Sequence, residues 1–184
     1  MIALIIILVI AVVVIVVGVA LYNGLIRSKN QVENAWSQID VQLKRRLDLI
    51  PNLVETVKGY AAHEQETLEQ VINARQAAIQ APDTPDGQKA PNDMLSGALG
   101  KLFALSEAYP DLKANTNYLA LQEELSATEG RVAYARQFYN DAVLGYNNKI
   151  ESVPSVFVAK MLNYEQREYF EASESARSVP NVEF

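Results

Sequence analysis

Cysteine is absent from this sequence, and histidine occurs only once, as His63. Without cysteine the chain has no disulfides, no thiolate metal ligands, no thiol nucleophile and no cysteine to carry a lipoprotein anchor. The single histidine excludes HExxH zinc chemistry, because the local segment HEQET lacks the second histidine that the motif requires. It also cannot supply the two Glu-x-x-His pairs of a dinuclear carboxylate bundle. We therefore expect His63 to be a structural residue, and we predict no metal and no cofactor.

Glycine and basic residues are also scarce. The 8 glycines form neither a glycine-rich phosphate loop nor a GxSxG nucleophile elbow, so no familiar enzyme class is indicated. The 16 Lys and Arg residues are outnumbered by 22 Asp and Glu, and the net charge of -6 argues against a nucleic-acid partner. What the chain has instead is Ala, Leu, Val, Gln and Glu, a composition typical of helical proteins. We predict an all-α fold and no enzymatic activity.

The first long feature of the chain is an uncharged run of Ile, Val, Leu and Ala at residues 2–22. A helix of this length crosses the hydrocarbon core of a bilayer. We predict a transmembrane helix that is not cleaved, because no basic residue precedes the run as it would in a secretory signal. Arg27 and Lys29 follow the run, and this positive charge favours a cytoplasmic soluble domain, with the periplasm as the alternative.

Helical spacing continues beyond this run. One stripe, with steps of three and four residues, contains Trp36, Ile39, Leu43, Arg46, Ile50, Leu53, Val57, Tyr60 and Glu64. We expect the membrane helix to run on past Gly24 and to form a mostly helical arm that extends as far as Gln80. Pro51 lacks an amide hydrogen and crowds the carbonyl of Leu47, so we expect a kink or a break between Asp48 and Asn52.

Further helices are expected after this arm. Residues 81–92 (APDTPDGQKAPN) predict a hairpin loop, with Asn92 or Asp93 as the cap of a helix that must end by Tyr109, because Pro110 follows. A seven-residue repeat between residues 112 and 150 predicts the seam of a coiled-coil-like helix packed antiparallel on the arm. The repeat consists of Tyr118, Leu125, Val132, Tyr139 and Tyr146.

Four segments carry a more specific pattern. They are QIDVQLKRRLDLIPNLVETVKGYAAHE at 38–64, YPDLKAN at 109–115, LQEELSATEGRVAYARQFYNDAV at 121–143 and YNNKI at 146–150. Together with Pro180, Val182 and Phe184, they closely resemble the LemA family of bacterial membrane proteins. The resemblance implies a membrane-anchored helical domain in a family without a settled molecular function.

The residues and the resemblance together predict the organisation of the chain. An N-terminal transmembrane helix continues into an elongated antiparallel helical bundle. We place the anchor at residues 1–26, the bundle at 27–172 and an extended C-terminal tail at 173–184. The predicted location is the bacterial inner membrane, which the chain crosses once.

The candidate functional residues are charged residues at inward positions, because a buried charge requires partners. They are Asp40, Arg46, Asp48, Glu64, Arg75, Glu129, Arg131 and Arg136. We expect a network across the helices that joins Arg46 or Arg75 to Glu129. A second connection is expected between Glu64 and Arg131 or Arg136. The expected role of this network is to fix helix register, not to bind a ligand.

Three functional hypotheses follow. The first is a noncatalytic scaffold or adaptor that contacts the lipid bilayer and self-associates into a homo-oligomer. The second is a regulatory module that binds another envelope protein, such as a protease or phosphatase, through Pro51, Asn52 and Phe184. The third is a hydrolase or metal enzyme built on Glu64, Glu129 and His63.

Overall fold

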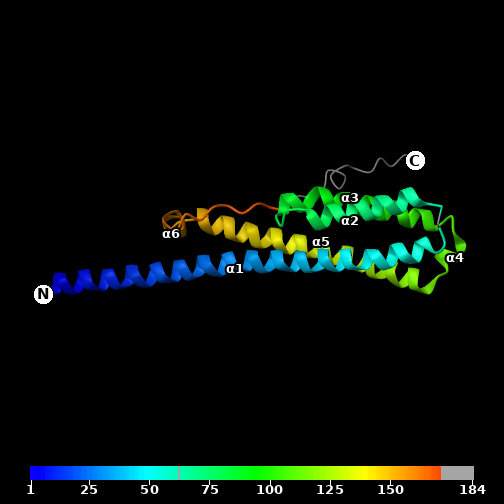
Figure 1. Cartoon of the computed structure of the whole chain (residues 1–184). Coiled ribbons are helices and arrows are strands. Elements are labelled where there is room, and N and C mark those ends of the chain that lie inside the picture. Colours follow the sequence, from blue (N-terminus) through cyan, green and yellow to red (C-terminus); the bar gives the residue numbers. More distant parts are fainter. Residues whose placement is uncertain (62, 171–184) are drawn as a thin grey trace, which may run out of the picture. The chain divides into compact units, whose positions relative to one another are not determined.

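The computed structural model describes residues 1–61 and 63–170, and helices are the only regular secondary structure in these residues. The helices are α1 (Ile2–Lys58), α2 (Gln65–Gln80), α3 (Pro85–Ser106), α4 (Pro110–Lys113), α5 (Thr116–Glu151) and α6 (Ser155–Met161) (Figure 1). The predicted all-α fold is confirmed. The predicted tail at 173–184, with Phe184, lies outside the described residues.

The chain divides into two compact units. Unit 1 consists of Met1–Gln38 and Gln137–Tyr169. Unit 2 consists of Ile39–Arg136 and Phe170–Phe184, and Phe170 is the only described residue of that second segment. The long helices α1 and α5 each contribute residues to both units.

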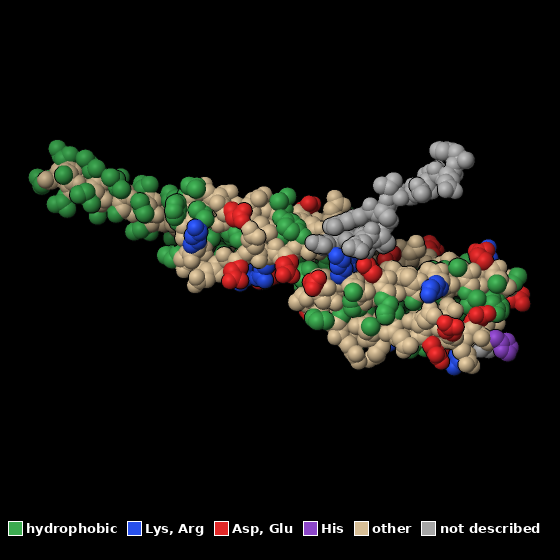
Figure 2. Space-filling model, turned by 90° about the horizontal axis from the view of Figure 1, so that it is seen from above, with side chains coloured by type: hydrophobic (Ala, Val, Ile, Leu, Met, Phe, Trp, Pro, Cys, Tyr) green, Lys and Arg blue, Asp and Glu red, His purple; other side chains and the backbone are tan. Residues whose placement is uncertain are grey.

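The N-terminal part of α1, in unit 1, is a candidate membrane span. An 18-residue window of this helix has a mean hydropathy of 3.7, and none of the window is buried. Large apolar side chains are exposed along this end of the chain, and Figure 2 shows them on the face in view. The core helix of a soluble protein would be mostly buried, whereas a helix that faces lipid is apolar around its whole circumference.

The remainder of α1 in unit 1 packs against α5. Its inward residues Leu25 and Ala35 are fully buried, and the Trp36 ring meets the Tyr139 ring edge-on with centroids 5.5 Å apart. At the other end of this contact, Lys149 Nζ donates a hydrogen bond to the Gly24 carbonyl over 3.1 Å. Trp36 contacts Tyr139, whereas the earlier residue Gly24 contacts the later residue Lys149. The two helices are therefore antiparallel in this unit.

After α6, the chain returns along α5 as an extended segment that is held by side chains. The Asn147 side chain is buried and bonds the backbone of Arg167 twice: Nδ2 donates to the Arg167 carbonyl, and Oδ1 accepts from the Arg167 amide, both over 2.9 Å. The Tyr139 hydroxyl donates to the Glu168 carbonyl over 2.9 Å. Because an extended segment cannot satisfy its own backbone groups, these side chains take the place of a neighbouring strand.

Unit 2 is organised around the C-terminal part of α1, which begins at Ile39. The stripe predicted from the sequence is buried there as far as Val57, with Ile50, Leu53 and Val57 all inaccessible to solvent, but its next member, Tyr60, is 44% exposed. The residues that pack with this stripe come from α2, α3, α4 and α5. Helices α2 and α3 lie side by side (Figure 1). The core also contains Leu68, Val71, Ala74, Leu95, Leu99, Leu102, Leu112, Tyr118 and Leu125. The seven-residue repeat, which runs along α5 through both units, is buried as well, each member being 0 to 4% exposed.

The predicted arm is shorter than expected. The sequence predicts helix as far as Gln80, but α1 ends at Lys58 and α2 begins only at Gln65. Pro51 does not break α1, because the helix continues through it. The real break lies at residues 59–64, where the helix opens into a turn at Gly59.

The predicted loop at 81–92 is also shorter than expected. Only residues 81–84 connect α2 to α3, because Pro85 takes the first helical position and the Thr84 hydroxyl accepts a hydrogen bond from the Gly87 amide over 3.1 Å. A Cβ at Gly87 would lie 2.8 Å from the Thr84 hydroxyl, so this turn requires glycine. Asn92 is therefore not a cap: it is buried inside α3, and its Nδ2 donates to the Gln88 carbonyl.

The Asn147 clamp makes a testable prediction. Replacement by alanine removes two hydrogen bonds to the backbone of Arg167, which is a loss of about 1–3 kcal/mol at about 0.5–1.5 kcal/mol each. We expect the extended segment to open locally and trypsin to cleave after Arg167 faster in Asn147→Ala than in the parent chain. The neighbouring Asn148 is exposed, so Asn148→Ala is the matched control. Equal cleavage rates in the two variants would contradict the proposed clamp.

Candidate functional site

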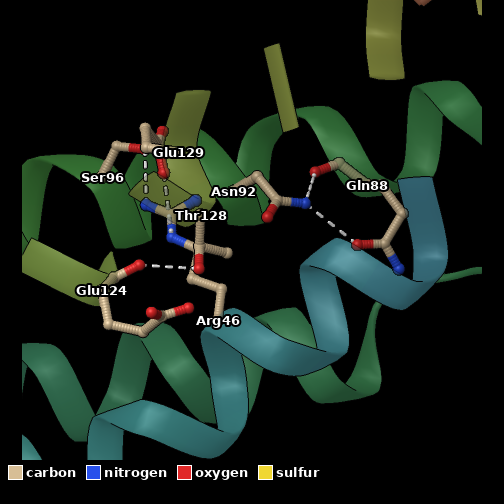
Figure 3. Close-up of polar contacts among 7 residues, drawn as sticks. All are labelled: Arg46, Gln88, Asn92, Ser96, Glu124, Thr128 and Glu129. Carbon is tan, nitrogen blue, oxygen red and sulfur yellow. Dashed lines mark hydrogen bonds and ion pairs between the residues drawn. The ribbon is translucent and has the colours of Figure 1, made fainter. Parts of the chain in front are cut away.

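The most buried charged side chain of the described residues is Arg46 of α1, which is 2% exposed. Its Nη2 donates to the Ser96 hydroxyl of α3 over 2.7 Å, and that hydroxyl donates to Glu129 Oε1 of α5 over 3.2 Å. Arg46 Nε lies 3.3 Å from Glu129 Oε2 (Figure 3). Three helices of unit 2 thus meet at one guanidinium group. The structure brings Arg46 and Glu129 together and adds Ser96, which sequence reasoning did not single out.

The electrostatics of this site are unbalanced. Burial lowers the pKa of Arg46, and the opposing attraction comes chiefly from Glu129, whose side chain is 48% exposed. Burial also lowers the pKa of Arg136, which lies with its guanidinium carbon 4.3 Å from the centroid of the Phe170 ring. Arg46 Nη1 and Arg136 Nε are buried without a hydrogen-bond partner. The two cations are therefore balanced mainly by Glu129, which is half in water, with a smaller attraction from Asp93, and this is a costly arrangement for a core.

Arg75 has a different role from the one expected. The sequence makes it a candidate partner of Glu129, but its Nε donates to the Leu47 carbonyl of α1 over 2.9 Å. This carbonyl lies four residues before Pro51, which has no amide hydrogen to give it. The guanidinium group of α2 thus supplies the hydrogen bond that proline removes from α1. The sequence shows both Pro51 and Arg75, but the spacing of residues along the chain does not show that Arg75 contacts the Leu47 carbonyl.

The structure shows a different partner for Glu64 than Arg131 or Arg136, with which the sequence predicts a connection. Glu64 lies after the end of α1 at Lys58. Its carboxylate instead accepts a hydrogen bond from the Tyr109 hydroxyl over 3.0 Å. Arg131 Nη1 is 3.1 Å from Glu124 Oε1, an atom that also lies 2.6 Å from Arg45 Nη2.

The remaining candidates lie toward the surface. Asp40 is half-buried and pairs with Lys44 one helical turn away, at 2.7 Å. Asp48 is exposed, so the expectation that it points inward is wrong; Pro51 and Asn52 are also exposed. His63 is exposed as well.

Two hollows adjoin these residues in unit 2. One has a volume of about 500 Å³ and is lined by Asp40, Lys44, Asp48 and Arg75, with Ile79 among its apolar residues. The other, of about 320 Å³, has Arg46, Ser96 and Glu129 on one side and Leu99, Phe103 and Leu125 on the other. Both mix charges of opposite sign, and in residues 1–61 and 63–170 no three Asp, Glu or His side chains are grouped so as to hold a metal ion.

The Pro51 and Arg75 pair predicts a specific coupling. Arg75→Ala should lower the free energy of unfolding by about 1.5–3 kcal/mol, the usual contribution of a hydrogen bond from a charged donor. In a Pro51→Ala background the same substitution should cost clearly less, because alanine at position 51 restores the amide that the Leu47 carbonyl needs. Denaturation of all four variants in detergent micelles, followed by circular dichroism, measures the difference. Equal costs in the two backgrounds would refute the pairing.

The Arg46 site predicts a rescue. Glu129→Gln leaves the Arg46 charge buried without its counter-ion and should cost about 1–3 kcal/mol, below the usual 3–5 kcal/mol because Glu129 is partly hydrated. Adding Arg46→Met removes the charge while filling similar volume, so the double variant should be more stable than Glu129→Gln alone. The same denaturation experiment checks this order. A double variant less stable than the single one would show that the charge pair is not what constrains this site.

Comparisons with known proteins show which family the chain belongs to. A sequence model of the LemA family matches residues 35–184. Protein LemA of Metamycoplasma hominis is 33% identical over 164 residues, which cover 88% of this chain and 74% of that protein. Magnetosome protein MamQ 2 of Paramagnetospirillum magneticum is 26% identical over 175 residues. Magnetosome protein MamQ of Magnetospirillum gryphiswaldense is 24% identical over 174 residues, and this chain spans 64% of the length of both magnetosome proteins. Because the family match covers most of the chain and a relative is similar over most of its own length, this chain belongs to the LemA family.

Proposed function

We propose that this protein is a noncatalytic scaffold or adaptor that is anchored in the bacterial inner membrane by the N-terminal part of α1 and that self-associates into a homo-oligomer. The soluble part faces the cytoplasm in this proposal, because Arg27 and Lys29 follow the apolar run. The periplasm is the alternative.

The observation that supports the noncatalytic role is that Arg46 and Arg75, two of the candidate residues in unit 2, have partners within the fold. Arg46 bonds Ser96 and lies beside Glu129, and Arg75 bonds a backbone carbonyl. A catalytic carboxylate or base needs a reachable atom that its own protein leaves available to a substrate. These groups instead connect one helix to the next, as expected of residues that fix register.

Self-association is supported by apolar side chains on an outer surface of unit 2. Ile72 and Ile79 lie seven residues apart on one side of α2 and are 49% and 48% exposed. A helix whose inner side is already packed and whose outer side repeats an apolar residue at this spacing is suited to pack against a further helix. A second copy of the chain supplies a matching surface by symmetry.

An alternative function is a regulatory module that binds another envelope protein. It is favoured by the exposure of Pro51 and Asn52, which leaves this part of α1 accessible. Photocrosslinking from position 52 distinguishes the two functions. Capture of a different protein supports the regulatory module, and capture of the chain itself supports the scaffold.

The scaffold predicts a multiple of the chain mass of 20.4 kDa when light scattering is measured on the full chain in a mild detergent. Ile72→Glu with Ile79→Glu should lower that mass, because four charges in a dimeric contact cannot be desolvated cheaply. Tyr134→Glu is the control, since Tyr134 is 72% exposed but lies on α5. A strictly monomeric parent chain would overturn the oligomer.

A further inference from the structure

The short helix α6 of unit 1 has its residues arranged in the reverse of a water-soluble helix. Its inward residues are small, Ser155 being 7% and Ala159 1% exposed. Its outward residues are large and apolar: Phe157 is 70% and Met161 75% exposed, and Val153, just before the helix, is 76% exposed. Phe157 and Met161 are four residues apart and share one side of the helix, and Val153 adds a third exposed apolar side chain in the turn before it. Contiguous large apolar side chains on an outer surface indicate an interaction site.

The contacts of α5 define where this surface lies within unit 1. The ring contact of Trp36 with Tyr139 and the hydrogen bond from Lys149 to Gly24 set the antiparallel register of α1 and α5. By this register the end of α5, at Glu151, lies level with the end of the apolar run of α1. The chain then continues into α6 in the direction of the N-terminus of α1 (Figure 1). The surface therefore lies at the boundary of the candidate membrane span.

Burial along α1 agrees with this position. Leu25 is fully buried and Leu21, inside the apolar run, is half-buried, whereas the large residues before it are exposed. The packed part of unit 1 thus reaches the last turns of the segment that the bilayer would surround. When α1 is inserted in the bilayer, this packed part of unit 1 must therefore contact the membrane surface.

The charges near α6 suit the same position. Lys160 is the only charged residue in the helix and is exposed, and Lys149, near the end of α5, is exposed as well. On α1, Arg27 is exposed at a similar level. The acid at the end of α5, Glu151, accepts a hydrogen bond from the side-chain amide of Gln166. Apolar side chains bordered by basic ones are typical of helices that lie in the headgroup region of anionic membranes.

We propose that α6 lies in the membrane interface, with Val153, Phe157 and Met161 inserted between headgroups and acyl chains of the leaflet from which α1 emerges. The protein then holds the bilayer at two places, and the second contact sets how unit 1 is oriented on the membrane. This inference rests on the anchoring part of the proposed function and is independent of self-association. The Ser155 hydroxyl, which donates to the Lys149 carbonyl over 2.6 Å, holds α6 against the end of α5.

The absence of cysteine makes the test direct, because single-cysteine variants of the full chain need no further substitution. Met161→Cys is labelled with an environment-sensitive fluorophore and reconstituted in vesicles of phosphatidylcholine and phosphatidylglycerol. Some vesicles carry lipids brominated near the headgroup and others carry lipids brominated near the chain ends. Val13→Cys reports insertion of α1, and Tyr134→Cys reports an exposed apolar position on α5. Val153→Cys repeats the measurement at a second position of the same surface.

We expect the labels at 161 and 153 to lose most of their fluorescence with shallow bromines and less with deep ones. The label at 13 should be quenched most by deep bromines, and the label at 134 by neither. Quenching at 13 without quenching at 161 and 153 would overturn the interfacial position of α6 while leaving the anchor in place. Disulfide formation between copies at position 161, without lipid quenching, would show that a second chain covers the surface and would equally overturn it. Absence of quenching at 13 would overturn the anchor, and the inference with it.

Discussion

One carbonyl group, that of Leu47, sets a constraint on which much of unit 2 depends. Pro51 removes the amide that a helix would offer this carbonyl, and an unpaired backbone group near a core is costly. Arg75 donates the missing hydrogen bond from α2. Helix α1 therefore continues as a helix through proline, and α2 is held beside it in a defined register. The turn at residues 59–64 is what allows α2 to come back so that this bond can form.

The Arg46 site imposes a second constraint of the same kind. A guanidinium group in a helical core is favourable only while Ser96 and Glu129 are in reach, so α3 and α5 have one good position along α1. An apolar residue at position 46 would avoid the cost of burying a charge, but it would fix the positions of α3 and α5 along α1 less strictly. The Arg46 and Arg75 contacts each join helices that are far apart in sequence, so both contacts can align one helix with another.

Unit 1 satisfies its polar groups by other means. Its extended return segment depends on Asn147 and Tyr139, which bond backbone atoms of Arg167 and Glu168. A tyrosine hydroxyl is neutral and able to donate near neutral pH, and burial raises the pKa of Tyr139 further. The segment returns from α6, so the same bonds hold the apolar surface of α6 at the end of α5. A membrane-facing surface and the clamp that positions it thus belong to one small unit.

Local pattern determined a large part of this protein. Helical spacing identified the buried stripe of α1 and the inward side of α5, because side-chain burial follows the 3.6-residue period directly. The uncharged length of residues 2–22 likewise identified the candidate span. Only the tertiary structure decided which partners the charged groups have. Arg75 donates a hydrogen bond to the Leu47 carbonyl, and Glu64 accepts one from the Tyr109 hydroxyl. It also decided where helices end, since Thr84 and Gly87 turned a proline-rich segment into the start of α3. Spacing within one helix carries no information about the helix opposite, and the partner of a buried charge is fixed by the packing of several elements at once.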